Sequence, residues 1–213
     1  MTEIVFILDR SGSMAGLEKD TIGGFNSMLD KQRKLSGNAV VSTILFDNQS
    51  EVIHDRIKIN DVANLTEKKY YARGTTALLD AVGGSIHHIG NIHKYARKED
   101  VPEKTIFIII TDGLENASRY YTYDKVKQMI ERQKKLYDWE FLFLGANIDA
   151  VKEAEKFGID ELKSVNYNCD SYGMALNYKV LNKTIGFMRT GESLSRDWKK
   201  EIEDDYKKRG DKQ

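Results

Sequence analysis

The chain has 213 residues, of which 40% are hydrophobic and 31% are charged, a composition typical of a globular protein with a substantial core. Its 33 Lys and Arg residues balance its 33 Asp and Glu residues, so the sequence lacks the basic excess of nucleic-acid-binding proteins, and we expect no nucleic-acid partner. The single cysteine, Cys169, excludes an intramolecular disulfide and a zinc site built from clustered cysteines.

No apolar run in the sequence approaches the ~20 residues of a membrane span, and the apolar run at 4–8 is shorter than that of a signal peptide. We therefore expect a cytoplasmic protein without a membrane partner. Because the sequence has one proline and no low-complexity linker, we expect one domain over residues 1–190. A charged helical extension over residues 191–213 would follow it.

Short apolar runs rich in β-branched residues predict strands, and apolar residues at helical spacing predict the helices between them. The expected strands cover residues 3–8, 39–46, 51–59, 105–111, 139–147 and, more weakly, 163–168. The expected helices cover residues 17–35, 77–95, 124–137, 149–157 and 171–188. The third strand is more polar than the others and alternates loosely, which favours an edge position.

Strands that alternate with helices are typical of an α/β fold with a mostly parallel sheet. The predicted fold class is a Rossmann-like, three-layer αβα arrangement with helices on both faces of a mostly parallel central sheet. One edge strand of this sheet would be antiparallel. In open parallel sheets, ligands bind just beyond the carboxyl ends of the strands.

Oxygen-bearing side chains follow two of the most apolar strands. Asp9, Ser11 and Ser13 come directly after the first strand, and Asp112 follows the fourth. With one threonine from the sequence RGTTALLDAV, they would provide five oxygen ligands of the kind that Mg²⁺ and Mn²⁺ prefer. Because hydroxyls are neutral, the two carboxylates would carry all the protein's charge at the site. The cation would then have room for one more anionic oxygen.

These three segments resemble the metal-ion-dependent adhesion site (MIDAS) of von Willebrand factor A-type (VWA) domains. The sequences DRSGS at 9–13, GTTALLDA at 74–81 and TDG at 111–113 match the family motif Asp-x-Ser-x-Ser, then Thr, then Asp, in order and spacing. The sequence GGFNSML in the first helix is similar to bacterial and phage-type members. The resemblance covers about residues 2–165, most of the chain.

The resemblance implies a non-enzymatic, metal-dependent protein-binding module whose protein partner completes the metal coordination with an Asp or Glu carboxylate. Thr76 is preferred to Thr75 as the threonine ligand, because Ala81 follows Thr76 at the distance typical of the family. Arg73 stands where the family commonly has glycine. The resemblance thus implies one Mg²⁺ or Mn²⁺ ion held by Asp9, Ser11, Ser13, Thr76 and Asp112.

Three alternatives remain open at the level of the sequence. Each Ser or Asp could instead cap a helix or form a turn. The chain could also be a structural subunit with a silent metal site. Finally, it could be a Mg²⁺-dependent, phosphotransferase-like enzyme. However, Ser11 stands where haloacid-dehalogenase-type phosphatases have their general acid and base, and the sequence contains no phosphate-binding loop or nucleophile elbow.

Other polar residues are weaker candidates for a site. His87, His88 and His93 lack the i, i+4 spacing of a helical metal site, so we interpret them as surface or core residues. Cys169 has no evident base partner and is interpreted as inert. Glu115 and Asn116 could form the rim of the metal site or could be ordinary loop residues.

Aromatic residues suggest two further surfaces. The tyrosine-rich segment 120–123 could recognise a partner or could be half-buried packing. In the tail, Leu194, Trp198, Ile202 and Tyr206 recur every fourth residue, which predicts a helix over 194–206 with one apolar stripe. Because an isolated helix of this length is marginal in water, we expect it to pack on its own domain. The alternative is docking to a partner or to a second copy of the chain.

Overall fold

The computed structural model describes residues 1–210, which contain a six-stranded sheet with the strand order β3-β2-β1-β4-β5-β6. All neighbouring strands are parallel except β3, which runs antiparallel to β2 at the edge. The strands are β1 (Thr2–Asp9), β2 (Ala39–Phe46), β3 (Ser50–Lys58), β4 (Lys104–Thr111), β5 (Glu140–Gly145) and β6 (Ser164–Asn166).

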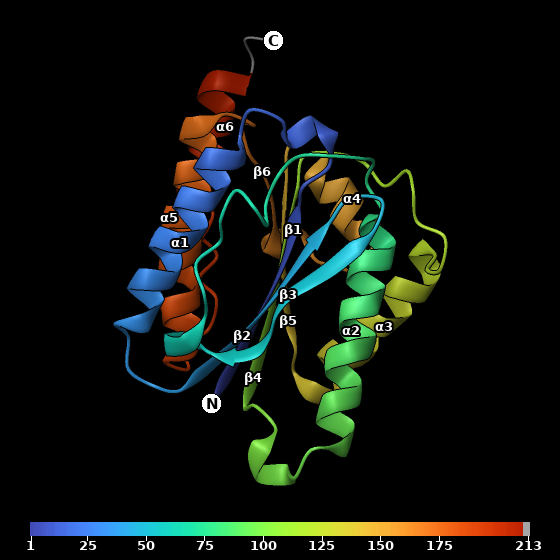
Figure 1. The fold of residues 1–213 in the computed structure, drawn as a ribbon, viewed down its shortest axis with the longest axis vertical. Coiled ribbons are helices and arrows are strands. Elements are labelled where there is room, and N and C mark those ends of the chain that lie inside the picture. The colour runs from blue at the N-terminus through green and yellow to red at the C-terminus, as the bar shows by residue number, and fades with distance from the viewer. Residues whose placement is uncertain (211–213) are drawn as a thin grey trace.

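Helices cover both faces of this sheet (Figure 1). One face carries α1 (Glu18–Arg33), α5 (Ser171–Arg189) and α6 (Lys200–Gly210), and the other carries α2 (Leu78–Tyr95), α3 (Tyr123–Tyr137) and α4 (Ala150–Lys156). The predicted three-layer αβα class with one antiparallel edge strand is confirmed. Short 3₁₀ helices lie at η1 (Gly12–Met14), η2 (Ile59–Asp61), η3 (Lys98–Asp100) and η4 (Glu161–Lys163).

The central strands are apolar on both faces because each face is buried under helices. In β1, Ile4, Phe6 and Leu8 pack into the layer of α1 and α5, whereas Val5 and Ile7 pack into the layer of α2 and α3. This arrangement explains why β1 and β4 read as continuous apolar runs rather than as alternating ones.

The register of β1 and β4 brings the polar ends of these strands to the same level. Leu8 pairs with Ile110 across the two parallel strands, so Asp9, the last residue of β1, and Asp112, directly after β4, lie at the same edge of the sheet. The carboxyl ends of these strands form the upper edge of the sheet in Figure 1. Two segments about 100 residues apart in sequence are thereby brought side by side. This proximity is the structural basis of the candidate site.

The C-terminal segment packs against the chain's own core. Trp198 and Ile202 are buried in the cluster that also contains residues of α1 and α5, and the indole N–H of Trp198 donates to the Leu162 carbonyl oxygen at 2.7 Å. The helix begins at Lys200 rather than at 194, because a turn in which the Trp198 N–H donates to the Ser195 carbonyl oxygen precedes it. The predicted boundary at residue 190 stays a prediction, and 211–213 lie outside the described residues.

No helix within residues 1–210 combines the length and the apolar character that are needed to cross a lipid bilayer.

Candidate metal centre

Two buried carboxylates form the base of the candidate site. Asp9 and Asp112 are each 2% exposed. Asp9 Oδ1 accepts the backbone N–H of Ser11 at 2.7 Å, and Asp9 Oδ2 accepts the hydroxyl of Thr111 at 2.6 Å. Because all of these donors are neutral, they orient the Asp9 carboxylate without neutralising its charge.

The serine hydroxyls link the two carboxylates. Ser13 Oγ donates to Asp112 Oδ1 at 2.7 Å and lies 3.1 Å from Ser11 Oγ. Gly12, between the two serines, lies close to the loop that carries Thr76. Its N–H donates to the Gly74 carbonyl oxygen at 3.1 Å, and a Cβ on Gly12 would lie only 3.2 Å from that oxygen. The glycine in the DRSGS sequence therefore has a steric reason.

Thr76, and not Thr75, is buried at the same edge. A Cβ built on Gly113 would lie 3.5 Å from Thr76 Oγ1 and 3.9 Å from Ser13 Oγ, so these hydroxyls flank the residue that follows Asp112. The structure therefore brings all five predicted side chains to one edge of the sheet. Their role as metal ligands stays a prediction.

Electrostatics at this edge favour a bound cation. Burial raises the pKa of Asp9 to about 6, against the lowering effect of the hydrogen bonds from Thr111 and Ser11, and burial also raises the pKa of Asp112. Within residues 1–210, neither carboxylate forms an ion pair with Lys, Arg or His. Buried charges are normally paired or coordinate a metal. The residues present therefore fit a divalent cation.

The donor set is of the kind that hard cations prefer. Over the described part of the chain, no group of three or more His, Cys, Asp or Glu side chains gathers as a metal cluster. The candidate site instead combines two carboxylates with three hydroxyls, and all five donors are oxygen atoms. Such a set suits Mg²⁺ or Mn²⁺ better than a soft, thiolate-binding metal.

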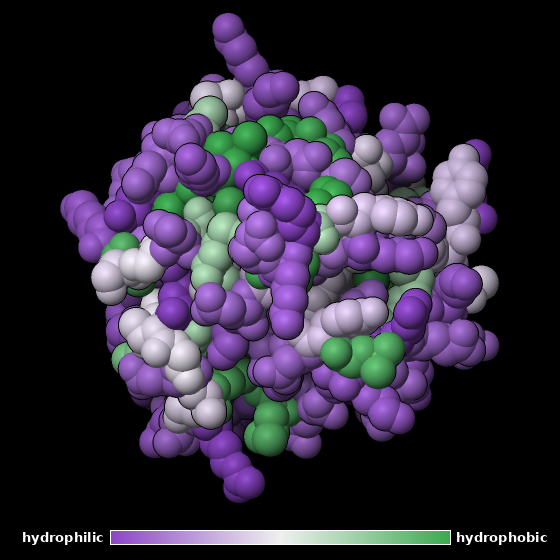
Figure 2. Space-filling view, turned by 90° about the horizontal axis from the view of Figure 1, so that it is seen from below, coloured by the Kyte–Doolittle hydropathy of each residue, from purple (hydrophilic) through white to green (hydrophobic). Residues whose placement is uncertain are grey.

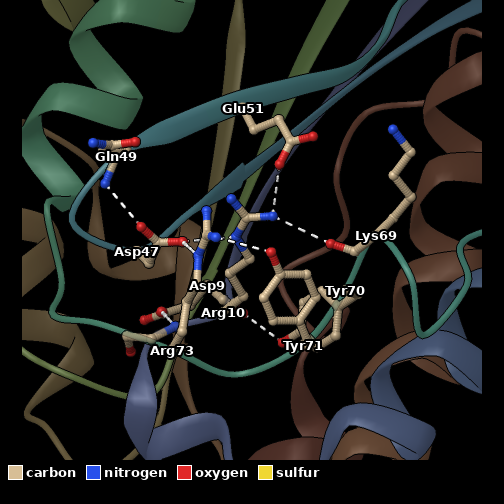
Figure 3. A network of polar contacts seen from close by, with 10 residues as sticks. Asp9, Arg10, Asp47, Gln49, Glu51, Lys69, Tyr70, Tyr71 and Arg73 are labelled. Carbon is tan, nitrogen blue, oxygen red and sulfur yellow. Dashed lines mark hydrogen bonds and ion pairs between the residues drawn. The ribbon is translucent and has the colours of Figure 1, made fainter.

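An ion-pair network centred on the buried pair Arg10 and Asp47, which the sequence did not reveal, connects the loops around the site (Figure 3). Arg10 is almost completely buried and donates to Asp47 Oδ2 and to Glu51 Oε2, both at 2.8 Å. Arg73 donates to the same Asp47 oxygen at 2.8 Å. Although burial acts to raise it, the hydrogen bonds from Arg73 and Arg10 hold the pKa of Asp47 below its usual value.

Backbone hydrogen bonds connect the same network to the Thr76 loop. The Arg73 N–H donates to the Arg10 carbonyl oxygen, and the Ala77 N–H donates to the Asp47 carbonyl oxygen, both at 2.8 Å. The Tyr70 hydroxyl donates to the Asp9 carbonyl oxygen (Figure 3). The loop from Tyr70 to Ala77 is therefore fixed to the ends of both β1 and β2.

Glu115 and Asn116, which the sequence left as possible rim residues, hold the Thr76 loop instead. Asn116 Oδ1 accepts the Thr76 N–H at 2.9 Å, and the Thr76 carbonyl oxygen accepts the Asn116 N–H at 3.0 Å. Glu115 accepts the N–H of Leu79 in the first turn of α2 at 2.7 Å. Asn116 therefore fixes the backbone of Thr76, and Glu115 fixes the first turn of the helix that follows it.

The weaker candidates lie in different environments. Cys169 Sγ lies 3.9 Å from Asp112 Oδ2, and burial raises the pKa of this thiol to about 12, so it stays protonated at neutral pH. His93 contacts the buried Glu3 at the other end of the sheet. The tyrosine-rich segment is divided, because Tyr120 is exposed whereas the Tyr123 hydroxyl donates to Glu153.

No protein-family model and no curated protein matches this sequence. Solved structures do match it. The vWF domain of the type V pili tip protein Mfa5 from Porphyromonas gingivalis has a TM-score of 0.63 and 10% identity, over 91% of this chain and 98% of that one. Proximal thread matrix protein 1 from the mussel byssus, with a zinc-occupied MIDAS motif, has a TM-score of 0.59 and 13% identity, over 87% and 46% of the two chains.

A von Willebrand factor type A protein from Catenulispora acidiphila has a TM-score of 0.55 and 17% identity, over 86% of this chain and 42% of that one. The chain thus spans less than half the length of the mussel and Catenulispora proteins that it matches. These identities are low, so the likeness lies in the arrangement of the elements. The chain has the fold of a von Willebrand factor A domain.

Proposed function

We propose that this chain is a metal-dependent protein-binding module. One Mg²⁺ or Mn²⁺ ion would be held by Asp9, Ser11, Ser13, Thr76 and Asp112. The observation that carries the proposal is the pair of adjacent, buried carboxylates without a cationic partner among the described residues. The zinc-occupied MIDAS of the mussel protein supports a divalent cation on this fold.

The partner would supply the last ligand as an Asp or Glu carboxylate. The five protein oxygens would leave one position of an octahedral coordination sphere open, and because three of them are neutral hydroxyls the metal would accept a further anionic oxygen there. The surface near this edge also carries apolar side chains, since Leu114 and Tyr71 are 53% and 42% exposed. These residues would pack beside the partner's carboxylate, as aromatic and apolar residues do at interfaces.

A binding role fits the surroundings of the site better than catalysis does. Three of the four histidines, the usual general bases, have contacts away from the site: His54 Nδ1 lies 3.0 Å from Thr43 Oγ1, His88 Nε2 lies 2.9 Å from Asp55 Oδ1, and His93 contacts Glu3. The fourth, His87, lines a groove beside α2. The protonated Cys169 thiol is a poor nucleophile. These contacts favour binding over catalysis, and the partner class we propose is a protein. The cytoplasmic location stays a prediction from the sequence.

Calorimetric titration with MnCl₂ and MgCl₂ tests the metal site. We expect one ion per chain for the wild-type protein and no measurable binding for Asp9→Ala, which removes one of the two charges. Asp20→Ala is the matched control, because Asp20 is a carboxylate on α1 outside the motif. Absence of binding by the wild type would favour the structural subunit with a silent site.

A capture experiment tests the partner. The whole chain serves as bait, in Mg²⁺ or in excess EDTA, and captured proteins are identified by mass spectrometry. We expect a partner that is retained in Mg²⁺ and is lost both in EDTA and with the Asp9→Ala bait. A partner that is retained equally under all three conditions would contradict the proposed metal-bridged contact.

A further inference from the structure

A groove of about 560 Å³ lies between α2 and α3, away from the candidate metal centre. Its walls come from residues 86–94 of α2 and 125–137 of α3, and Val101, Pro102 and Trp139 close it. Figure 2 views the molecule from below, the end opposite the metal centre, where hydrophilic residues predominate and apolar residues show between them. The volume falls in the range of ordinary ligand sites.

The floor of the groove is apolar and rigid. Ile86 and Trp139 are buried, and Met129 is half-buried beside them. The Trp139 ring stacks on Phe107 at a centroid distance of 5.1 Å and meets the His93 ring edge-on at 5.3 Å. Since these contacts fix the indole ring, the floor is preformed for an apolar side chain.

The rim of the groove is positively charged. Lys94 comes from α2, and Lys125 and Arg132 come from α3, whereas none of the described lining residues is acidic. Within residues 1–210, none of these three cations forms an ion pair, although Lys134 on the same helix pairs with Asp160 at 2.9 Å. A rim with three cations and no acidic lining residue is complementary in charge to an anionic occupant.

The spacing of the cations favours an extended occupant. Lys125 and Arg132 are seven residues apart on α3, which places them about 10 Å apart along the helix axis. An extended segment that carries several carboxylates can pair with each of these cations separately. Lys94 lies across the groove on α2, so such a segment would run between the two helices.

We propose that this groove binds an acidic peptide segment of a protein partner, with one apolar side chain between its carboxylates. The apolar side chain packs on Trp139, Ile86 and Met129, and the carboxylates pair with Lys94, Lys125 and Arg132. This contact is independent of the metal centre, which lies at the upper edge of the sheet. A partner could therefore bind either site without the other.

Fluorescence anisotropy tests this proposal with a labelled peptide that has two glutamates on each side of one phenylalanine. Titrated in EDTA with the whole chain, the peptide is expected to bind saturably. Lys125→Glu and Arg132→Glu, which change exposed residues, are each expected to weaken binding at least tenfold. Replacing the phenylalanine with serine is expected to weaken it comparably, because the apolar floor then loses its occupant.

The matched control is Lys135→Glu, which makes the same charge change on an exposed residue of the same helix outside the groove. We expect it to change the affinity less than twofold, and replacing EDTA with Mg²⁺ to leave the wild-type affinity unchanged. Three results would overturn the proposal: no saturable binding in EDTA, equal weakening by Lys135→Glu, or binding at least tenfold tighter in Mg²⁺ than in EDTA. The last would place the peptide at the metal centre, and it would leave the proposed function standing.

Discussion

The central strand β1 carries a buried acid at each end, and the two acids have different hydrogen-bond partners. Glu3, at the lower end, is fully buried, receives a hydrogen bond from Arg56 at 2.9 Å and contacts His93. Asp9, at the upper end, is 2% exposed and accepts hydrogen bonds only from neutral groups. Its charged neighbour is another acid, Asp112, which further disfavours its ionisation.

This difference separates a structural acid from a candidate metal ligand. A buried carboxylate costs several kcal/mol unless a cation and hydrogen bonds compensate it. For Glu3 the chain itself supplies the cation, Arg56. For Asp9 the described chain supplies none, so the compensating charge would have to come from solution. A divalent metal is the simplest such charge, and the surrounding hydroxyls suit it.

The largest effect on stability is expected at the paired acid. Glu3→Gln keeps the shape of the side chain but leaves Arg56, which is mostly buried, without its counter-charge. We expect urea unfolding at pH 7 to show a loss of about 3 kcal/mol. Metal affinity of the folded variant should match that of the wild type. A loss of metal binding without a loss of stability would contradict the assignment of a structural role to Glu3 and of metal binding to Asp9.

The pH dependence of metal binding tests whether Asp9, the acid without a cationic partner, has a raised pKa. The pKa of Asp9 is raised from 3.8 to about 6, so the folded protein takes up a proton there as the pH falls through 6. Because the metal must displace this proton, affinity for Mn²⁺ should fall about tenfold between pH 7.5 and pH 5. Calorimetry at the two pH values measures this change. An affinity that is unchanged at pH 5 would contradict the raised pKa.

Stability without metal should show the opposite trend. In the folded state Asp9 holds its proton more tightly than in the unfolded chain, so this group's contribution to stability decreases as the pH rises from about 4 to 6. Above that range the full deficit, about 3 kcal/mol, remains until a cation is bound. Urea unfolding in EDTA at pH 4.5 and pH 7 tests this trend.

The threonine pair is expected to affect metal binding less than Asp9→Ala does, because a hydroxyl is a neutral ligand. Thr76 is buried beside Gly113, whereas Thr75 is exposed. Thr76→Val removes the hydroxyl and keeps the shape, and we expect it to weaken Mn²⁺ binding about tenfold. Thr75→Val is the matched control and should leave the affinity within twofold. The reverse order of effects would show that Thr75 is the ligand.

The sequence predicted the fold and the meeting of the three motif segments for a simple physical reason. The apolar runs of β1 and β4 are continuous because both faces of the sheet are covered, and parallel strands end at one edge. Residues at the carboxyl ends of these strands, such as Asp9 as the last residue of β1 and Asp112 directly after β4, must therefore come together once the two strands are neighbours.

The supporting contacts could not be predicted in the same way. Arg10 and Asp47 are 37 residues apart, and Glu3 and His93 are 90 residues apart, so their pairing depends on strand order and register. These charged residues are visible in the sequence, but the sequence does not indicate that they pair in the interior, because a charged residue within a motif or after a strand usually faces solvent. The late start of α6 was missed because a turn can hold Trp198 inward as well as a helix can.

The most direct test of the central claim is the unfolding free energy of Asp9→Asn at pH 7.5, in EDTA and in Mn²⁺ at 100 times the Kd. We expect Asp9→Asn to be at least as stable as the wild type in EDTA, because it removes an uncompensated buried charge. In Mn²⁺ the wild type should gain about 2.7 kcal/mol and the variant nothing. If the variant is clearly less stable than the wild type in EDTA, or if Mn²⁺ stabilises it as much as the wild type, the result would contradict the claim that Asp9 is an uncompensated buried charge that binds a cation.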